Sequence, residues 1–296
     1  MAKTIAASLI AAVIASALTT YFVARPPADY VQEVSEPKIE SVYDRVMRTN
    51  TIRCGYAMYP PAFYADPESG EFAGIMHDLT VKIAETLNLE IEWAEEVSYG
   101  DMAQGLEARR YDLICSGKWL IAQQAIVADF STPVFYTTMG IYAQVDDTRF
   151  DSDPYQLIND SSVVIATVDG DINTNIAAFE FPEARTFSLP QLSDKSLMLL
   201  NVATDKADVT FADLPTAYDF LHANPGTVRN ITPDKPIRVY ETAYMLRNGE
   251  VRFKNMLNNA VKDLSNNGYV DKLLHKYEKY PGSFHRVANP YQKVEH

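Results

Sequence analysis

The sequence predicts an α/β fold with two lobes, each containing a mostly parallel sheet, joined by two crossover segments. Strand-like and helix-like segments alternate in two separate blocks, residues 51–117 and 162–222, and such alternation is typical of parallel sheets. Two extended segments, residues 129–145 and 237–248, follow these blocks. Each is long enough to leave one sheet and enter another, so we expect the chain to cross between the lobes twice.

The first block is predicted to form a strand–helix–strand–helix–strand unit. Its first helix is amphipathic, because Leu79, Ile83 and Leu87 recur at four-residue spacing and so share one face. In chain order the expected elements are a short helix at 41–50, a strand at 51–57, the turns "MYPPAFY" and "PESGEFAG", the amphipathic helix, a strand at 89–96, a helix at 99–110 and a strand at 111–117.

The second block repeats the alternation and is followed by a helical C-terminal region. The pattern changes from period two to helical spacing several times, as expected for successive strands and helices. The expected elements are strands at 162–168, 185–189 and 207–213, helices from about 172, at 192–206 and at 214–222, and a helix–turn–helix at 251–280.

Composition and charge favour an acidic globular protein. The chain has 296 residues, of which 47% are hydrophobic, and its formal net charge is −13. A hydrophobic content of this size is sufficient for one large core or two ordinary ones. A polyanion would be repelled by the negative charge, and runs of basic residues are absent from the sequence. We therefore expect no nucleic-acid partner.

Residues 4–24 form an uncharged, apolar segment at the N-terminus. The segment is long enough to span a bilayer, and Ala15-Ser16-Ala17 offers a cleavage site. It is therefore either a cleaved export signal or a retained anchor in the inner membrane, and the sequence favours neither. The expected parts of the chain are a signal peptide or membrane anchor at 1–24, a linker at 25–40, lobe 1 at 41–139 and 239–285, lobe 2 at 140–238 and a C-terminal tail at 286–296.

The two cysteines, Cys54 and Cys115, are 61 positions apart. This separation lacks the short paired spacing of a zinc site or a redox dithiol. We interpret both as buried thiols in strand-like segments. A disulfide between them is the alternative, because an exported protein folds in an oxidising compartment.

The order of the motifs resembles the amino-acid-binding family of extracytoplasmic solute-binding proteins, which have the type II periplasmic binding fold and serve ABC importers. The resemblance covers roughly residues 43–280. The motifs that carry it are "IRCGYAMYPPAF", "GEFAGIMHDLTVKIAETLNL", "YDLICSG", "ADFSTPVF", "KADVTFADLPTAYDFL" and "MLRNGEVRFKNMLNNAVKDLSNNGYVDKLLHKY". The resemblance implies a two-lobed periplasmic-binding-protein-like fold with a solute cleft between the lobes.

Several positions match the ligand-binding residues of that family. The resemblance places Tyr59 and Phe63 where the family stacks aromatic rings on its ligand, although "PPAF" has one residue more than the family's "PPF". Gly117 and Trp119 fall in the turn that offers backbone and hydroxyl groups to the ligand. Asp213 matches the acid that binds the ligand's α-amino group.

Other positions depart from the family and change the expected ligand. Gln124 stands where the family has an arginine that binds the α-carboxylate, and Gly170-Asp171 stands where the family has Gly-Thr or Gly-Ser. Tyr56 occupies a position that is often Asp. Since losing one partner of a buried ion pair costs about 3–5 kcal/mol, a free carboxylate would be poorly held. Ring faces nearby favour an ammonium instead, so we expect a cationic or neutral solute.

Each of these residues also has a purely structural interpretation. Asp213 and Asp171 both precede predicted helices and are suited to be N-caps. Trp119 is alternatively a packed aromatic under its turn, and Gln124 alternatively faces solvent from a helix. We interpret Lys118 as a solvated surface lysine, with anion binding as the alternative.

We therefore hypothesise that the protein binds a small polar solute outside the cytoplasm, by hinge closure near residues 137–141 and 239–243. The solute is cationic or neutral, need not be a standard α-amino acid, and is passed to an ABC-type permease of the inner membrane. The alternative is a membrane-anchored sensor or accessory subunit that uses the fold as a protein-binding module.

Catalysis is not expected. The sequence has none of the common nucleophile, phosphate-loop or paired-histidine motifs. A dehydratase-like reaction in the cleft is the minor alternative. No cofactor and no metal are expected, because the five histidines do not have the spacing of metal ligands.

Overall fold

The structure is a computed structural model that describes residues 39–191 and 193–287. The described residues from Ser41 onward form one compact unit. The predicted signal or anchor segment lies outside the described residues, as do most of the predicted linker and the C-terminal tail.

Three strands form the first parallel set of the sheet. β1 (Thr51–Tyr56) pairs in parallel with β4 (Glu90–Glu96) on one side and with β5 (Leu113–Trp119) on the other. Helices α3 (Ile75–Leu87) and α4 (Met102–Glu107) lie in the two connections. The predicted strand–helix–strand–helix–strand order is therefore confirmed.

Helix α3 illustrates how the local sequence sets the bounds of an element. Its apolar face buries Leu79 and Ile83. Gly74 precedes the helix with a φ of 125°, and a Cβ there would lie 2.5 Å from the carbonyl oxygen of Ala62, so only glycine fits. The helix ends at Asn88, which is left-handed and donates its N–H to carbonyls of the last turn.

Three further strands form the second parallel set. β8 (Val164–Val168) pairs in parallel with β9 (Arg185–Leu189) and with β10 (Val209–Asp213). The predicted second block is therefore confirmed as well. The helices of this part are α6 (Ile172–Glu180), α7 (Ser196–Ala203) and α8 (Leu214–Ala223).

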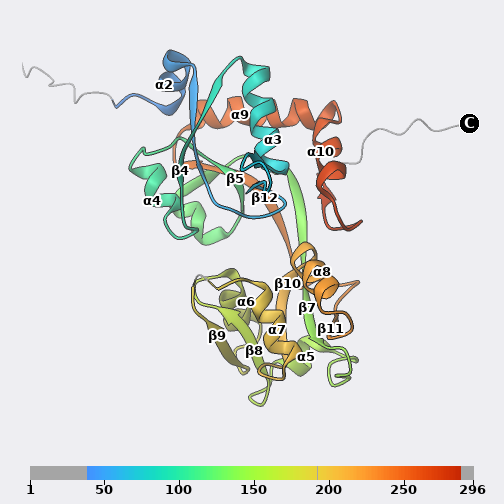
Figure 1. Cartoon of the computed structure of the whole chain (residues 1–296). Helices are drawn as coiled ribbons and strands as arrows, with labels where there is room; N and C mark the ends of the chain where they lie inside the picture. Colours follow the sequence, from blue (N-terminus) through green and yellow to red (C-terminus); the bar gives the residue numbers. More distant parts are fainter. Residues whose placement is uncertain (1–38, 192, 288–296) are drawn as a thin grey trace, which may run out of the picture. The chain divides into compact units, whose positions relative to one another are not determined.

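Two long strands connect the two parallel sets (Figure 1). β7 (Phe135–Gln144) runs antiparallel to β10, and β12 (Arg238–Arg247) runs antiparallel to β5. β7 and β12 also pair with each other, with Thr138 opposite Val239. These are the two expected crossover segments, and their mutual pairing makes the hydrogen bonding of the sheet continuous from one set to the other.

The other described elements cover or extend this sheet. α9 and α10 confirm the predicted helix–turn–helix and pack with α3. The segment after β5 forms a 3-10 helix without buried residues. The remaining elements are α2 (Val42–Thr49), β2 (Tyr64–Ala65), β3 (Phe72–Ala73), η1 (Ala122–Ile126), β6 (Ala128–Phe130), α5 (Pro154–Ile158), β11 (Val228–Asn230), α9 (Val251–Asn266), α10 (Tyr269–Tyr277) and β13 (His285–Arg286).

Each parallel set has its own hydrophobic core. The largest core lies between the first set and helices α2, α3, α9 and α10. The second set has a core on each face, because successive residues of a strand point to opposite sides. In β7, for example, Ile141 and Ala143 belong to one core and Tyr142 to the other. Separate cores agree with a two-lobed fold, while the predicted residue boundaries of the lobes stay a prediction.

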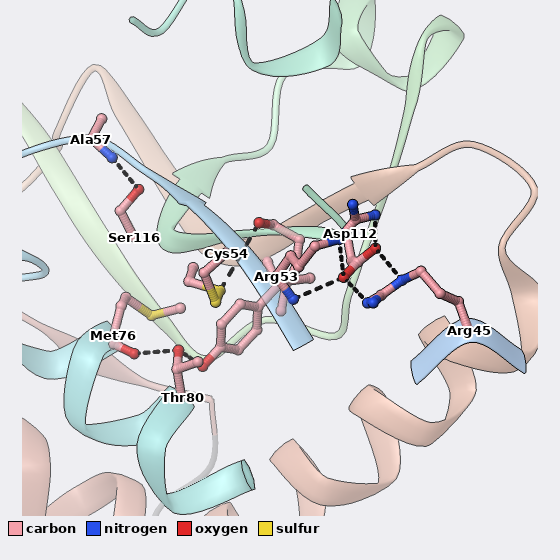
Figure 2. The surroundings of a disulfide bond; sticks show 11 residues. Arg45, Arg53, Cys54, Ala57, Met76, Thr80, Asp112 and Ser116 are labelled. Carbon is pink, nitrogen blue, oxygen red and sulfur yellow. Dashed lines mark hydrogen bonds and ion pairs between the residues drawn. A yellow bond between two sulfur atoms is a disulfide. The ribbon is translucent and has the colours of Figure 1, made fainter. Parts of the chain in front are cut away.

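The interpretation of Cys54 and Cys115 as free thiols is wrong. The two residues form a disulfide between the neighbouring strands β1 and β5, with their Cα atoms 5.5 Å apart (Figure 2). Both are completely buried. The separation of 61 residues conceals this proximity, because the crossover through α3, β4 and α4 returns the chain to the strand beside β1.

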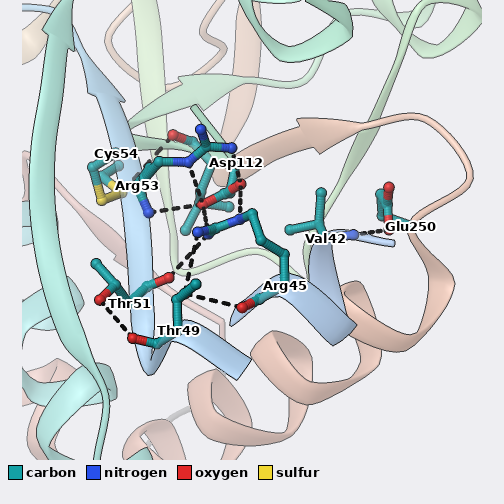
Figure 3. Close-up of polar contacts among 10 residues, drawn as sticks. Val42, Arg45, Thr49, Thr51, Arg53, Cys54, Asp112 and Glu250 are labelled. Atoms are coloured by element: carbon teal, nitrogen blue, oxygen red, sulfur yellow. Dashed lines mark hydrogen bonds and ion pairs between the residues drawn. A yellow bond between two sulfur atoms is a disulfide. The ribbon is translucent and has the colours of Figure 1, made fainter. Parts of the chain in front are cut away.

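A buried carboxylate anchors α2 (Val42–Thr49), the first described helix, to the first set (Figure 3). Asp112 is 1% exposed and pairs with the guanidinium groups of Arg45 and Arg53. It also accepts a hydrogen bond from the backbone N–H of Arg53 at 2.8 Å. At the start of α2, the backbone N–H of Val42 donates to Glu250 at 2.9 Å. The chain is therefore tied to the core from its first described helix.

Candidate functional site

The predicted ligand residues follow the carboxyl ends of parallel strands. Tyr59 follows β1, Trp119 ends β5, Asp171 follows β8 and Asp213 ends β10. In open parallel sheets, ligands bind at this edge, where loops and helix N-termini meet. The structure brings these four side chains, from both parallel sets, into one group.

Asp213 joins the two parallel sets through Tyr59. The carboxylate is 3% exposed, and its Oδ1 caps α8 by accepting from the backbone N–H of Thr216 at 2.8 Å. Its Oδ2 accepts from the hydroxyl of Tyr59 at 2.6 Å. Burial, together with the charge of Asp213, holds the pKa of Tyr59 well above its ordinary value, so the phenol stays protonated and remains the donor.

Trp119 packs against aromatic rings on two sides. It stacks on Tyr240 of β12 with ring centroids 4.8 Å apart and planes 6° apart. Its other aromatic neighbour is Tyr59, whose ring lies edge-on with the two ring centroids 6.1 Å apart. Trp119 therefore packs against neighbouring rings, as the structural interpretation has it, and it also lies within the group of predicted site residues.

Lys195, which we did not predict, occupies the middle of this group. Its Nζ lies 5.5 Å from the ring centroid of Tyr59, 5.6 Å from that of Trp119 and 5.8 Å from that of Tyr99. The nearest carboxylate oxygen is Oδ2 of Asp171, at 3.3 Å. An ammonium group over aromatic faces is stabilised by the ring quadrupoles, so the site already contains one cation.

Asp171 is an N-cap and an ion-pair partner at once. Its Oδ1 accepts from the backbone N–H of Ile172 at 2.7 Å and caps α6. Its Oδ2 is buried and faces Lys195 without the geometry of a hydrogen bond. The N-cap interpretation of Asp171 and Asp213 is thus correct, and each still has an oxygen directed at a charged or polar group.

Lys118 is a second cation at this edge. Its Nζ lies 4.6 Å from the ring centroid of Tyr99. Desolvation, and secondarily the charge of Lys195, lowers the pKa of Lys118 to about 8, while Asp171 opposes the shift. The interpretation of Lys118 as a solvated surface lysine is therefore wrong, because the side chain is largely removed from water.

Only glycine fits the backbone conformation and the surroundings at position 117. Its φ is +78°, and a Cβ would lie 2.8 Å from Cγ2 of Thr242 and 3.0 Å from Cγ of Met76. Lys118 and Trp119 are the next two residues and complete β5. Gly170 also has a positive φ, +74°, at the turn before Asp171.

Tyr56 and Phe63 lie in a separate cluster of aromatic rings, away from the group around Lys195. Phe63 is completely buried and packs with the rings of Tyr56, Phe72 and Trp93. Reciprocal backbone hydrogen bonds between Tyr59 and Phe63 close the intervening turn. The structure therefore does not group these two predicted ligand residues with Tyr59, and their role stays a prediction.

Gln124 lies in η1 and is only partly exposed. Its Oε1 is buried and has no hydrogen-bond partner within the described part of the chain. The alternative interpretation, in which Gln124 faces solvent from a helix, does not account for this buried oxygen. None of its contacts links it to the group around Lys195, and its role also stays a prediction.

Tyr99 and Lys195 were missed because each was assigned to a predicted helix, at 99–110 and at 192–206, whereas α4 begins only at Met102 and α7 only at Ser196. Tyr99 follows β4 and Lys195 follows β9, so both belong to the same carboxyl edge as the predicted residues. The strands themselves are evident from the sequence, and the loops after them were the available signal.

The space between these residues is nearly closed. A cavity of about 10 Å³, lined among others by Trp119, Asn173, Lys195 and Asp213, has room for about one water molecule. A larger cavity of about 260 Å³ lies near the amino ends of β8 and β10, lined by Asp147 and Asp208 among others. Because ligands bind at the carboxyl ends of parallel strands, the smaller cavity is the better candidate for the solute site.

Within residues 39–191 and 193–287, no group of three or more His, Cys, Asp or Glu side chains is arranged to hold a metal ion. In the same ranges no helix has both the length and the apolar character needed to cross a membrane.

The fold and the site define a two-lobed solute-binding protein of the periplasmic type. Residues 52–280 match the model of the bacterial extracellular solute-binding proteins, family 3, and the chain belongs to this family. The predicted resemblance and fold are therefore confirmed. The family description also agrees with a location outside the cytoplasm.

Curated relatives are named as amino-acid-binding proteins. A probable histidine-binding protein of Campylobacter jejuni is 23% identical over 231 residues, covering 78% of this chain and 86% of the relative. A probable amino-acid ABC transporter-binding protein of Haemophilus influenzae is 24% identical over 233 residues, with 78% and 86% covered. These relatives support solute binding as the general function.

Solved structures share the fold. The crystal structure of an ancestral amino acid-binding protein, AncCDT-1, described as a precursor of cyclohexadienyl dehydratase, has a TM-score of 0.66 at 22% identity, covering 81% of this chain and 100% of that one. A cysteine-binding protein from Campylobacter jejuni has a TM-score of 0.65 at 16% identity, covering 81% and 94%.

Proposed function

We propose that the protein captures a small polar solute, cationic or neutral, between its two lobes and delivers it to an ABC-type permease. The observation that carries this proposal is the convergence of Tyr59, Trp119, Asp171 and Asp213 at the carboxyl edge of both parallel sets. The relatives are named as amino-acid-binding proteins, one of them of an ABC transporter, which supports the delivery step.

The chemistry of this edge favours a solute with an ammonium group. Tyr59, Tyr99 and Trp119 already surround the ammonium of Lys195 at 5.5–5.8 Å, so the rings accommodate a cation. Asp171 and Asp213 supply negative charge within the same group. An ammonium over a desolvated ring gains about 0.5–2 kcal/mol.

Binding requires the lobes to separate first. A cavity of about 10 Å³ is far smaller than the 300–1,000 Å³ that small-molecule sites typically occupy. We infer that the crossings at residues 137–141 and 239–243 absorb the rotation. A solute that contacts both lobes then favours the closed state over the open one.

We further propose that the protein is not an enzyme and that it works in the periplasm. The curated relatives are binding proteins, which supports the first statement. The anchored-sensor alternative depends on residues 4–24, which lie outside the described residues, and it stays a prediction.

Isothermal titration with amino acids, polyamines and quaternary amines tests this function. We expect at least one ammonium compound to bind with a dissociation constant below 1 mM, and Asp213→Asn to weaken it about tenfold or more, as for a lost charge-assisted contact. Asparagine retains the N-cap, so the fold should persist. The matched control is Asp153→Asn, an N-cap of α5 away from the site. The proposal is rejected if no compound class binds at millimolar concentration.

A further inference from the structure

The segment that follows α10 reaches from the first parallel set to the second. We call residues 278–286 the C-terminal strap. The strap ends in β13, which pairs with the start of the crossover strand β7, with His285 opposite Tyr136. Phe284 is 5% exposed and belongs to the core of the first set, where its ring centroid lies 5.2 Å from that of Phe135. The base of the strap is therefore fixed to the first set, beside the point where the chain begins to cross.

Polar contacts hold the strap in one shape. Glu278 accepts hydrogen bonds from two backbone N–H groups of the strap, at 3.0 Å and 3.2 Å. Arg286 pairs with Glu278 at 3.4 Å and with Asp271 of α10 at 2.8 Å. The side chains of Glu278 and Arg286 are only 10% and 20% exposed, so solvent shields these contacts less than it would on an open surface. The tip of the strap is therefore presented in a defined position.

The tip of the strap contacts α8, a helix of the second set. Oδ1 of Asp219 accepts hydrogen bonds from Nζ of Lys279 at 2.6 Å and from the hydroxyl of Tyr280 at 3.0 Å. The ring of Tyr280 also packs against that of Tyr218, with the ring centroids 4.9 Å apart. Two neighbouring residues of the strap thus meet two neighbouring residues of α8, through an ion pair, a second hydrogen bond and a ring contact.

Helix α8 contacts the first set at two places in the closed state. Its N-cap, Asp213, accepts a hydrogen bond from the hydroxyl of Tyr59, and Asp219 follows about 9 Å further along the helix axis. Lobes move largely as rigid bodies during hinge opening. A rotation that separates Asp213 from Tyr59 therefore moves all of α8, and it also changes the contact between Asp219 and the strap.

We propose that the C-terminal strap is a latch that holds the lobes closed and that salt releases it. The side chains of Lys279 and Asp219 are 63% and 61% exposed, and an ion pair of this kind is weak and screened by salt. The ring contact beside it adds to the attraction. This inference goes beyond the proposed function, because it concerns the lobes without a solute and does not depend on which compound binds. Ionic strength then sets the fraction of the resting protein that is open.

The test measures the distance between the lobes in the solute-free full chain at pH 7. Spin labels are attached at Lys262→Cys in α9 and at Thr186→Cys in β9, which are exposed positions in the two sets. Both cysteines of the natural sequence are in the disulfide, so the label reacts only at the introduced sites. Double electron–electron resonance then gives the populations at short and long distance.

Three variants are compared in this labelled protein. Asp219→Asn removes the charge that both strap residues contact, and Tyr280→Phe removes one hydrogen bond while it keeps the ring. Glu85→Gln breaks an exposed ion pair within α3 and changes the net charge by the same amount as Asp219→Asn, so it is the matched control. All three positions are at the surface, and we expect melting temperatures close to that of the wild type.

We expect Asp219→Asn to raise the ratio of long to short distances about twofold to fivefold at low salt, the factor that corresponds to an exposed ion pair. Glu85→Gln should leave the ratio unchanged. Raising the salt from about 0.01 M to about 1 M shortens the Debye length from about 30 Å to about 3 Å. The wild type should then approach Asp219→Asn, while the variant itself changes little. Tyr280→Phe should shift the ratio less and keep the response to salt, since its ion pair remains.

Two results would overturn the latch. The first is the same distance distribution in the wild type, Asp219→Asn and Glu85→Gln at both salt concentrations. The second is a shorter distance in Asp219→Asn, which would show that the strap holds the lobes apart. Neither result involves a solute, so the proposed function would stand in both cases and is tested separately by titration.

Discussion

The hydroxyl of Tyr59 donates a hydrogen bond to Asp213 across the two parallel sets, at 2.6 Å. Tyr59 follows the first strand of one set, and Asp213 ends the last strand of the other. The contact therefore exists only when the two carboxyl edges face each other. It links the stability of the closed state to the residues of the candidate site.

Replacing Tyr59 with phenylalanine should favour the open state. The change leaves an oxygen of the buried Asp213 without its partner, which costs about 1–3 kcal/mol. We expect a lower free energy of unfolding and a larger radius of gyration in small-angle scattering. Tyr155→Phe, which removes an exposed hydrogen bond to a backbone carbonyl, is the control and should have a smaller effect. An unchanged radius together with unchanged stability would contradict the closing role of Tyr59.

Removing the disulfide should destabilise the first lobe. The bond closes a segment of 61 residues, and loss of a native disulfide typically costs about 2–5 kcal/mol. We expect Cys54→Ala/Cys115→Ala to lower the denaturation midpoint accordingly. A peptide map run without reductant checks the bond itself, and recovery of both residues as free thiols would refute it.

Replacing Asp112 with alanine should be among the most damaging single changes. It would leave the guanidinium groups of Arg45 and Arg53 without their buried partner, a loss of about 3–5 kcal/mol for a broken buried pair. Chemical denaturation measures the change. Glu85→Gln, which breaks the exposed pair with Lys82, is the control and should have little effect. Comparable losses in the two variants would show that burial of Asp112 is not the cause.

Stability should rise with pH in the range where Lys118 titrates. Its pKa is lowered from 10.5 to about 8 in the folded state, so between these values the unfolded chain binds more protons. Since stability rises with pH wherever the unfolded state binds more protons, the lysine's penalty is complete below pH 8 and disappears by pH 10.5. Desolvation is the main cause of this lowered pKa, the charge of Lys195 adds to it, and the charge of Asp171 opposes it.

Comparing the wild type with Lys118→Met isolates this contribution from other groups. The wild type should gain stability relative to the variant between pH 8 and pH 10, measured by denaturant unfolding at several pH values. A constant difference between the two proteins over this range would rule out the lowered pKa.

The sequence was sufficient to predict the fold, because alternating periodicity is a local signal that survives in each segment. Both parallel sets, the two crossovers and the C-terminal helix pair follow from it. The disulfide did not follow, since the proximity of Cys54 to Cys115 depends on which strands become neighbours. That neighbour relation is a property of the complete sheet.

The grouping of the candidate site residues was predicted in part, while their roles stay predictions. Asp213, Asp171, Trp119 and Tyr59 lie together as expected, because strand ends are visible in the sequence. Phe63 did not join them, since the side on which it packs is decided by the turn after β1. Lys195 was missed because it was assigned to the predicted helix at 192–206, and only the fold brings it close to three rings.

The pairing of β7 with β12 restricts how the lobes can move. Thr138 and Val239 are opposite each other in a hydrogen-bonded ladder, so the two connections cannot swing independently as loose tethers would. A hydrogen-bonded pair of strands bends readily out of the plane of the sheet, but it resists sliding of one strand along the other. We therefore expect the proposed opening to be confined to one direction, so that the lobes return to the same mutual alignment when they close.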